Sequence, residues 1–317
     1  TGSGQNLEGV RVYAFSENGS YLGISDTTDS GGRAFFRLPA GNYNFRADYQ
    51  GSQYWAETTL LADQLNPVDI STGGGSFTFN VFKTETAPLT GVNCYVFSES
   101  GTYLGLNAQT DEGGQVVFDL SDGVYKIRVD YLGYQFWGDL FGLPETLSRT
   151  LQINHTDVSL TVEGLFQGNA QALEGVNVYL FKPGGSYLGQ NRISDESGTV
   201  AFDLPEQPYK VRADYLGQQF WSAEFVSQDT ALYLPMADTV ITVTGSDQPL
   251  EDVWVYVFAE SGSYLGKSDK TNSDGQVLFR LPAGKYKFRA DYQGSQFWAE
   301  KNLFDDQLNP DNSILIR

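Results

Sequence analysis

The sequence predicts an all-β protein made of four tandem β-sandwich domains that together form an elongated rod. Three observations lead to this fold class. One pattern recurs four times within the 317 residues, and apolar and polar residues alternate inside each copy. Glycine (35 residues) and aromatic residues (14%) are also abundant, as suits tight turns and pleated strands.

The repeat is regular in its core and variable in its connections. The distance from the first core valine to the tryptophan is 45 residues in every copy. The four cores are Val10–Trp55, Val92–Trp137, Val176–Trp221 and Val253–Trp298. Units of about 80 residues exceed a solenoid repeat, so each is expected to fold as a small domain. We place the boundaries at 1–75, 76–156, 157–237 and 238–317 and refer to these segments as repeats 1 to 4.

Period-two alternation predicts the strands inside each repeat. In repeat 1 it predicts strands over 10–15, 33–38 and 43–49. Further first strands are predicted at Phe77–Val81, Val158–Val162 and Val240–Val243, and last strands at Leu151–Ile153, Leu232–Leu234 and Ile314–Ile316. About seven short strands in each repeat predict an immunoglobulin-like sandwich.

Repeat 1 has no counterpart of these first strands. Only nine residues, Thr1–Gly9, precede its first core valine, and among them only Leu7 is strongly apolar. A sandwich without its first strand exposes unpaired backbone groups beside its core. We therefore expect the missing strand to come either from upstream sequence in a longer parent chain or from a neighbouring molecule.

The order of motifs resembles two known families. Repeat 1 shows a GVRVYAF strand at Gly9, a TDSGG turn at Thr28 and the segment LPAGNYNF at Leu38. This order, present in all four repeats, is similar to the carboxypeptidase-regulatory-like and collagen-adhesin B-type families. The resemblance implies transthyretin-like sandwiches strung in tandem on microbial surface proteins. Some adhesin-type members cross-link a strand lysine to Asn or Asp, but residues 1–82 contain no lysine.

Composition excludes several functions. With 20 basic and 39 acidic residues the net charge is −19, which repels nucleic acid and anionic lipid surfaces. No apolar run is long enough to span a membrane. One histidine and one cysteine, Cys94, cannot assemble an ordinary zinc site or a disulfide within the chain. Cys94 replaces a core valine, which predicts a buried small side chain.

The turn motif offers two interpretations. A TDSGG-type turn carries Asp or Asn beside glycine, which favours a tight hairpin closed by the side chain. The alternative is calcium binding, because clustered carboxylates on loops suit a hard cation. The candidate calcium ligands are Asp26, Asp29, Asp111, Asp195, Asp269 and Asp274.

Aromatic pairs end each repeat core and give a candidate contact surface. The tryptophans Trp55, Trp137, Trp221 and Trp298 follow Tyr or Phe and point to the opposite strand face. They predict either a second packing layer or an exposed platform for lateral contacts or sugar stacking. Arg46 and Asp48, like their counterparts, share a strand face and predict a surface ion pair.

Two asparagines lie in N-glycosylation sequons, Asn18 and Asn154. Taken together, the sequence favours a non-catalytic structural segment of an extracellular or cell-surface filament, stalk or adhesin. The expected partners are further copies or a continued repeat chain. The alternative is a polysaccharide-binding surface protein that uses the Trp and Tyr faces.

Overall fold

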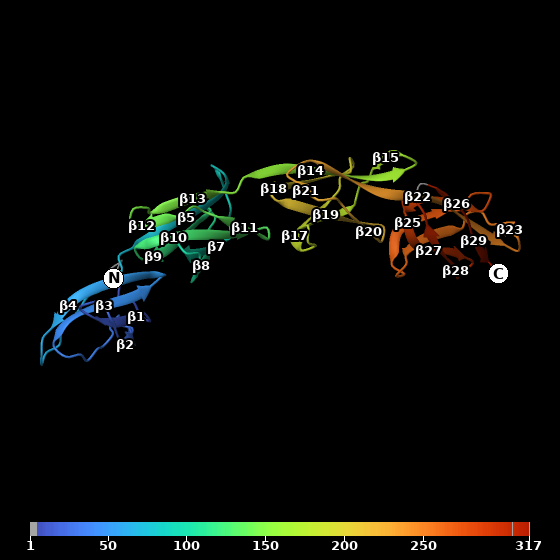
Figure 1. The fold of residues 1–317 in the computed structure, drawn as a ribbon. Coiled ribbons are helices and arrows are strands. Elements are labelled where there is room, and N and C mark those ends of the chain that lie inside the picture. The colour runs from blue at the N-terminus through green and yellow to red at the C-terminus, as the bar shows by residue number, and fades with distance from the viewer. Residues whose placement is uncertain (1–4, 306, 317) are drawn as a thin grey trace. The chain divides into compact units, whose positions relative to one another are not determined.

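The computed structural model describes residues 5–305 and 307–316 (Figure 1). All regular structure within these ranges is β-strand, and no helix there is long and apolar enough to cross a membrane. The chain divides into two compact units, Thr1–Asn154 and His155–Arg317. The fold is all-β and sandwich-like, as predicted; the division into four domains stays a prediction.

Each repeat contains an antiparallel sheet, called sheet I below, whose strands lie within the 45-residue core or directly after it. In repeat 1 the order is β2-β1-β3-β4, and in repeat 2 it is β11-β10-β7-β8 with β12 also paired to β10. Their bounds are β1 Arg11–Ser16, β2 Tyr21–Thr27, β3 Gly41–Tyr49, β4 Ser52–Leu60, β7 Asn93–Ser98, β8 Tyr103–Gln109, β10 Gly123–Tyr131, β11 Tyr134–Trp137 and β12 Phe141–Leu143.

The second unit repeats this arrangement twice. Sheet I has the order β17-β16-β19-β20, with β21 paired to β19, in repeat 3, and β25-β24-β27-β28 in repeat 4. The strands are β16 Asn177–Phe181, β17 Tyr187–Ile193, β19 Pro208–Tyr215, β20 Gln218–Trp221, β21 Phe225–Val226, β24 Trp254–Ala259, β25 Tyr264–Lys270, β27 Gly284–Tyr292 and β28 Ser295–Leu303.

The opposing sheet, sheet II, is built around the first strand of the repeat. In repeat 2 the central β5 is antiparallel to β9 and parallel to β13, and the short β6 follows at its end. These strands are β5 Gly75–Thr84, β6 Ala87–Pro88, β9 Gln115–Leu120 and β13 Ser148–Gln152. The predicted strand Phe77–Val81 therefore lies at the centre of the sheet.

In the second unit one long strand serves two sheets II. β22, Thr230–Gly245, pairs in parallel with β14 through its first half. Its second half pairs with β26 and β29. The remaining strands are β14 His155–Phe166, β15 Asn169–Ala172, β18 Thr199–Pro205, β23 Gln248–Pro249, β26 Gln276–Pro282 and β29 Leu308–Ile316. The predicted strands Leu232–Leu234 and Val240–Val243 are thus parts of one continuous strand.

The core lies between the two sheets of a repeat. In repeat 2, Phe77 and Phe79 of sheet II belong to the same buried cluster as Cys94 of sheet I. The ring of Phe77 stacks on Phe141 with centroids 3.9 Å apart. Alternation therefore sends every second side chain of both sheets into one apolar layer.

Repeat 1 departs from this plan. Residues 33–38, predicted as a strand by their alternation, form none, whereas β9, β18 and β26 occupy the corresponding positions in repeats 2 to 4. The alternation persists, since Ala34, Phe36 and Leu38 face the small core of repeat 1. A strand also needs a hydrogen-bonded neighbour, and repeat 1 offers no central strand within the residues described. The expectation for Thr1–Gly9 falls partly on residues 1–4, which lie outside them.

Candidate functional site

The acidic candidates of the turn motif close tight turns. Asp29 Oδ1 accepts hydrogen bonds from the amides of Gly31 at 2.9 Å and Arg33 at 3.0 Å. Asp111, Asp195 and Asn272 receive the same pair of amide bonds in the other repeats. The side chain therefore closes the turn, as the sequence favoured. The predicted hairpin is wrong, because in repeats 2 to 4 the turn joins a strand of sheet I to a strand of sheet II.

The other calcium candidates also contact local backbone. Asp26 accepts from the amides of Phe35 at 2.7 Å and Thr27 at 2.9 Å, and these bonds lower the pKa of its carboxyl group. Asp269 accepts from the amide of Lys270, and the amide of Asp274 donates to Asn272. Within residues 5–305 and 307–316, no three acidic, His or Cys side chains form a group that could hold a metal. Calcium binding stays an untested prediction.

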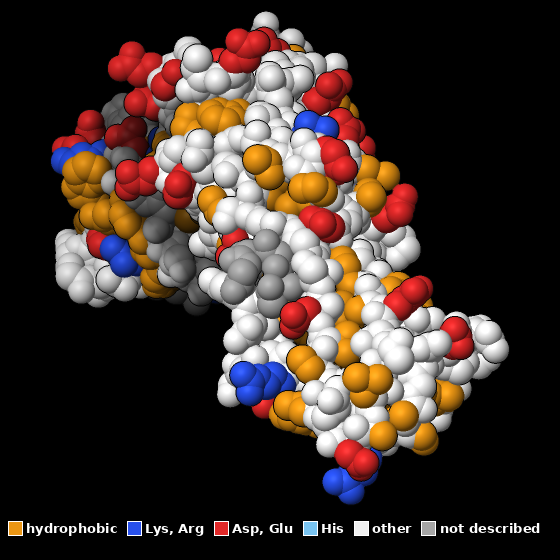
Figure 2. Space-filling model, turned by 90° about the vertical axis from the view of Figure 1, so that its left-hand side faces the viewer, with side chains coloured by type: hydrophobic (Ala, Val, Ile, Leu, Met, Phe, Trp, Pro, Cys, Tyr) orange, Lys and Arg blue, Asp and Glu red, His pale blue; other side chains and the backbone are white. Residues whose placement is uncertain are grey.

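The four tryptophans lie on the outer face of sheet I and are about half exposed. Their exposed fractions are 48% for Trp55, 41% for Trp137, 48% for Trp221 and 48% for Trp298. Each indole packs on a phenylalanine of the opening strand, with ring centroids 4.8–4.9 Å apart. Hydrophobic side chains are visibly exposed between acidic ones on the face that Figure 2 shows.

An arginine organises each of these aromatic clusters. Strand pairing places Arg46 opposite Tyr13 and Trp55. Its guanidinium carbon lies 4.7 Å from the Tyr13 ring centroid and 5.6 Å from that of Trp55. Asp48 holds the guanidinium from the side, with Nε to Oδ1 at 2.7 Å. The predicted ion pair is therefore present and fixes a cation–π contact.

The cluster is repeated with little change. Arg128, Arg212 and Arg289 make the same ion pair with the Asp two residues on and the same contact with the tyrosine ring. Arg212 and Arg289 also lie over their tryptophan rings, whereas Lys126 lies over Trp137 in repeat 2. Sequence reasoning found the tryptophans and the Arg-x-Asp spacing but treated them separately. Only strand register, which pairs Tyr13, Arg46 and Trp55, joins them. We call the four groups the aromatic–arginine clusters.

In the first unit the tip of the β3–β4 hairpin of repeat 1 contacts repeat 2. The Gln50 side chain accepts from the amide of Ser121 at 2.7 Å and donates to the carbonyl of Asp119 at 3.2 Å. The hydroxyl of Tyr54 donates to Ser121 Oγ at 2.7 Å and to the carbonyl of Asp122. A Cβ on Gly51 would lie 3.1 Å from Ser98 Cβ.

The second unit has the same contact between repeats 3 and 4. A Cβ on Gly217 would lie 3.1 Å from Ala259 Cβ and 3.4 Å from Leu265. Leu216, next to that glycine, packs against the core of repeat 4. Both glycines have positive φ, 81° and 79°, so a glycine tip lets each hairpin approach the neighbouring repeat closely.

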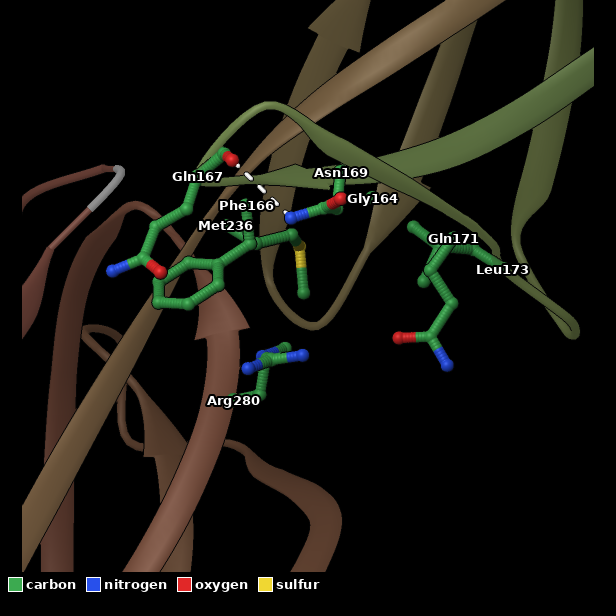
Figure 3. A pocket seen from close by; sticks show the side chains of 8 residues that line it. All are labelled: Gly164, Phe166, Gln167, Asn169, Gln171, Leu173, Met236 and Arg280. Atoms are coloured by element: carbon green, nitrogen blue, oxygen red, sulfur yellow. Dashed lines mark hydrogen bonds between the residues drawn. The ribbon is translucent and has the colours of Figure 1, made fainter.

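A shallow pocket of about 290 Å³ lies where β14 and β15 meet β22 and β26 (Figure 3). Its one charged lining residue, Arg280, is held by Asp238 at 2.6 and 2.8 Å. This pair raises the pKa of Arg280. The guanidinium also lies 4.4 Å from the ring centroid of Phe166. A Cβ on Gly164 would meet Met236 at 2.9 Å. The pocket therefore lies at the contact between repeats 3 and 4. Its arginine already interacts with Asp238 and Phe166 of the same chain.

The cysteine thiol is buried and the histidine ring contacts an aspartate. Cys94 is fully buried as predicted, and burial raises the pKa of its thiol to about 12. His155 Nδ1 lies 2.9 Å from Asp203 Oδ1. The sequon residues Asn18 and Asn154 are exposed; their glycosylation stays untested.

No family model and no curated protein matches the chain. Similar solved structures include the Bacillus anthracis TIE protein, at 17% identity and a TM-score of 0.26; the match covers 96% of this chain and 65% of that one. The minor pilin GBS52 of Streptococcus agalactiae is 14% identical, with a TM-score of 0.32 and coverage of 51% and 94%. The major pilin subunit BcpA of Bacillus cereus is 11% identical, with a TM-score of 0.23 and coverage of 77% and 98%.

Proposed function

We propose that this chain is a non-catalytic structural segment of an extracellular or cell-surface filament, stalk or adhesin. The observation that carries the proposal is β22. Its first half pairs with β14 of repeat 3 and its second half with β26 of repeat 4. A strand that crosses from one sheet into the next cannot hinge without breaking ladder hydrogen bonds.

The joint residues of β22 are buried as well as paired. Met236 and Ala237, at the crossing point, are 4% and 0% exposed and lie opposite Pro282 and Leu281. A flexible linker would instead be solvated and rich in Gly or Ser. A rigid joint of this kind transmits force between repeats, which is what a filament or stalk requires.

The hairpin contacts add a second restraint of the same kind. The tip at Gly51 and the tip at Gly217 contact equivalent positions of the following repeat. Equivalent contacts in the two units support docking of repeat 1 on repeat 2 and of repeat 3 on repeat 4. The resemblance to tandem repeats of microbial surface proteins supports an extracellular location.

The aromatic–arginine clusters supply the contact surface in this proposal. Each presents a half-exposed indole that packs on a phenylalanine and lies beside a cationic side chain, an arginine in repeats 1, 3 and 4 and Lys126 in repeat 2. Rigid, partly exposed aromatic rings lose little entropy on contact. Each of the four copies would then supply an aromatic contact for lateral packing of filaments.

Immunogold electron microscopy of the cells that make the protein tests the proposal. Antibodies raised against the 317-residue chain should label filaments or the cell surface, and antibody pre-absorbed with the chain should give no label. Label confined to the cell interior would overturn the proposed role.

A further inference from the structure

Repeat 4 carries a continuous series of aromatic rings on the outer face of its sheet I. Neighbouring rings have centroids 4.9–6.2 Å apart, in the order Trp254, Tyr256, Tyr264, Phe258 and Trp298. We call these five residues the repeat 4 aromatic face. Trp254, Tyr264 and Trp298 are 43%, 49% and 48% exposed. Contiguous exposed apolar surface of this kind marks an interaction site.

Two tryptophans distinguish this face from those of the other repeats. The position of Trp254 is occupied by Arg11, Asn93 and Asn177 in repeats 1 to 3. The aromatic–arginine cluster of repeat 4 is thus extended along β24 by a second exposed indole. Two indoles on one face give two places where a flat ligand can stack.

A cavity of about 300 Å³ opens beside Trp298 and is lined by this indole, Lys287, Glu300 and Gly262. The ring of Phe258 packs on the indole with centroids 4.9 Å apart, and the Arg289 guanidinium carbon lies 5.7 Å from it. The indole is therefore held in place before a ligand binds. The cavity is at the small end of the range of ligand pockets, about 300–1,000 Å³, which suits a single six-membered ring.

Repeat 2 shows the same position with its indole covered. Lys126 is the counterpart of Lys287, and its Nζ lies 4.8 Å from the ring centroid of Trp137. In repeat 4 the Lys287 ammonium instead pairs with Glu300 at 3.4 Å. The ammonium held by Glu300 leaves the indole face open, and Trp298 is more exposed than Trp137, 48% against 41%.

The charges around the repeat 4 aromatic face are paired within the protein. Lys270 pairs with Asp252 and Lys285 with Glu260, each at 3.2 Å. Lys287 pairs with Glu300, and Arg289 pairs with Asp291 at 2.8 Å. A charged ligand would have to compete with these ion pairs. A neutral ligand need not, because an ammonium and a carboxylate each have more hydrogen-bonding sites than one ion pair occupies.

We propose that the repeat 4 aromatic face binds a neutral polysaccharide of β-linked glucopyranose units, with one sugar ring stacked on Trp298. Such a ring carries its hydroxyl groups at its edge and presents C–H bonds on both sides. It therefore stacks on the indole while its hydroxyls exchange hydrogen bonds with Lys287 and Glu300. A further unit of the same chain stacks on Trp254. The proposal concerns repeat 4 alone and does not depend on the filament role.

Isothermal titration calorimetry of the full chain with cellohexaose, a β-linked glucose hexamer, tests the proposal. Cellohexaose should bind at one molecule per chain, and the anionic oligogalacturonate should bind more weakly. Trp298→Ala should weaken cellohexaose binding about tenfold, the loss expected of one aromatic stacking contact. Trp137→Ala is the matched control, because that indole also packs on a phenylalanine at 4.9 Å. It should leave the affinity for cellohexaose unchanged.

A second variant guards against misfolding of Trp298→Ala. Trp254→Arg introduces the residue of repeat 1, where Arg11 lies 5.7 Å from the Tyr13 ring centroid. Repeat 4 should fold with this arginine and bind cellohexaose several-fold more weakly. The proposal is overturned if cellohexaose does not bind, if both repeat 4 variants keep the native affinity, or if oligogalacturonate binds more tightly. Self-association that both variants abolish and cellohexaose does not inhibit would overturn it as well, since a second copy would then be the occupant.

Discussion

The segment that joins repeats 1 and 2 offers a sharp test of how tightly they are joined. Residues 71–76 include Gly73, Gly74 and Gly75, a composition typical of a flexible linker. Yet Thr72 is buried and its carbonyl accepts from the amide of Asp122 at 2.9 Å. A Cβ on Gly74 would lie 2.0 Å from the carbonyl oxygen of Leu120, and its φ is 94°.

The substitution Gly74→Ala should therefore cost stability in two ways. An alanine at positive φ costs about 1–2 kcal/mol. Relieving the contact with Leu120 requires a backbone shift that breaks the hydrogen bond between the Asp122 amide and the Thr72 carbonyl. The loss of this bond costs about 1 kcal/mol, in addition to the steric strain. The control is Gly101→Ala in repeat 2, where φ is 84° and nothing lies within 4 Å of the added Cβ. It should show only the conformational cost.

Hydrogen exchange at the Asp122 amide measures the difference. Exchange in Gly74→Ala should be about tenfold or more faster than in Gly101→Ala, because each 1.4 kcal/mol corresponds to a factor of ten. Equal exchange rates of the Asp122 amide in the two variants would refute the packed junction and would show that residues 71–76 act as a flexible linker.

Three other predictions concern groups at known positions. The thiol of Cys94, with its pKa raised to about 12, should not react with thiol reagents at pH 8 until the chain is unfolded, which a colorimetric thiol assay shows. Burial raises the pKa of the Tyr125 and Tyr286 hydroxyls above the ordinary 10. The stability that these two hydroxyls contribute should be fully present below pH 10 and be lost as the pH rises above it, because the unfolded chain then loses these protons first, and urea titrations between pH 8 and pH 11 measure the loss. Tyr54→Phe should keep the packing but weaken the contact with Ser121, lowering the unfolding free energy by roughly 1 kcal/mol in urea titrations.

Alternation of apolar and polar residues predicted a strand correctly wherever a neighbouring strand was present to pair with it. Alternation placed Phe77–Val81 and the burial of Cys94 correctly, because both lie in complete sandwiches. The same signal was wrong for residues 33–38, since a strand is defined by its neighbour as well as by its own pattern. Within the residues described, repeat 1 offers these residues no central strand to pair with.

The joint between repeats 3 and 4 could not be read from the sequence. The sequence predicted two separate strands, Leu232–Leu234 and Val240–Val243, with Pro235 between them; proline cannot donate to a ladder. In the structure β22 continues through it, with Pro235 opposite Leu165 and its carbonyl accepting from the amide of Ala283. A proline at a position where no donor is needed leaves the strand intact, and only the pairing partners reveal such a position.

The candidate contact surface was found in part. The sequence left the tryptophans open between a second packing layer and an exposed platform, and it predicted for Arg46, at the centre of the first aromatic–arginine cluster, only an ion pair. Residues 13, 46 and 55 are far apart in sequence and meet through strand register. Such cross-strand neighbours are set by the register of strand pairing, and the local alternation of apolar and polar residues does not determine that register.

The distance between spin labels in repeats 3 and 4 tests most directly whether neighbouring repeats form one rigid body. The full chain would carry Cys94→Val, with labels at Glu196→Cys and Asp274→Cys, two exposed turn positions. Double electron–electron resonance should give a single narrow distance distribution, because β22 belongs to both sheets. A broad or multiple distribution would show that the repeats move independently, and would contradict the rigid joint on which the structural role depends.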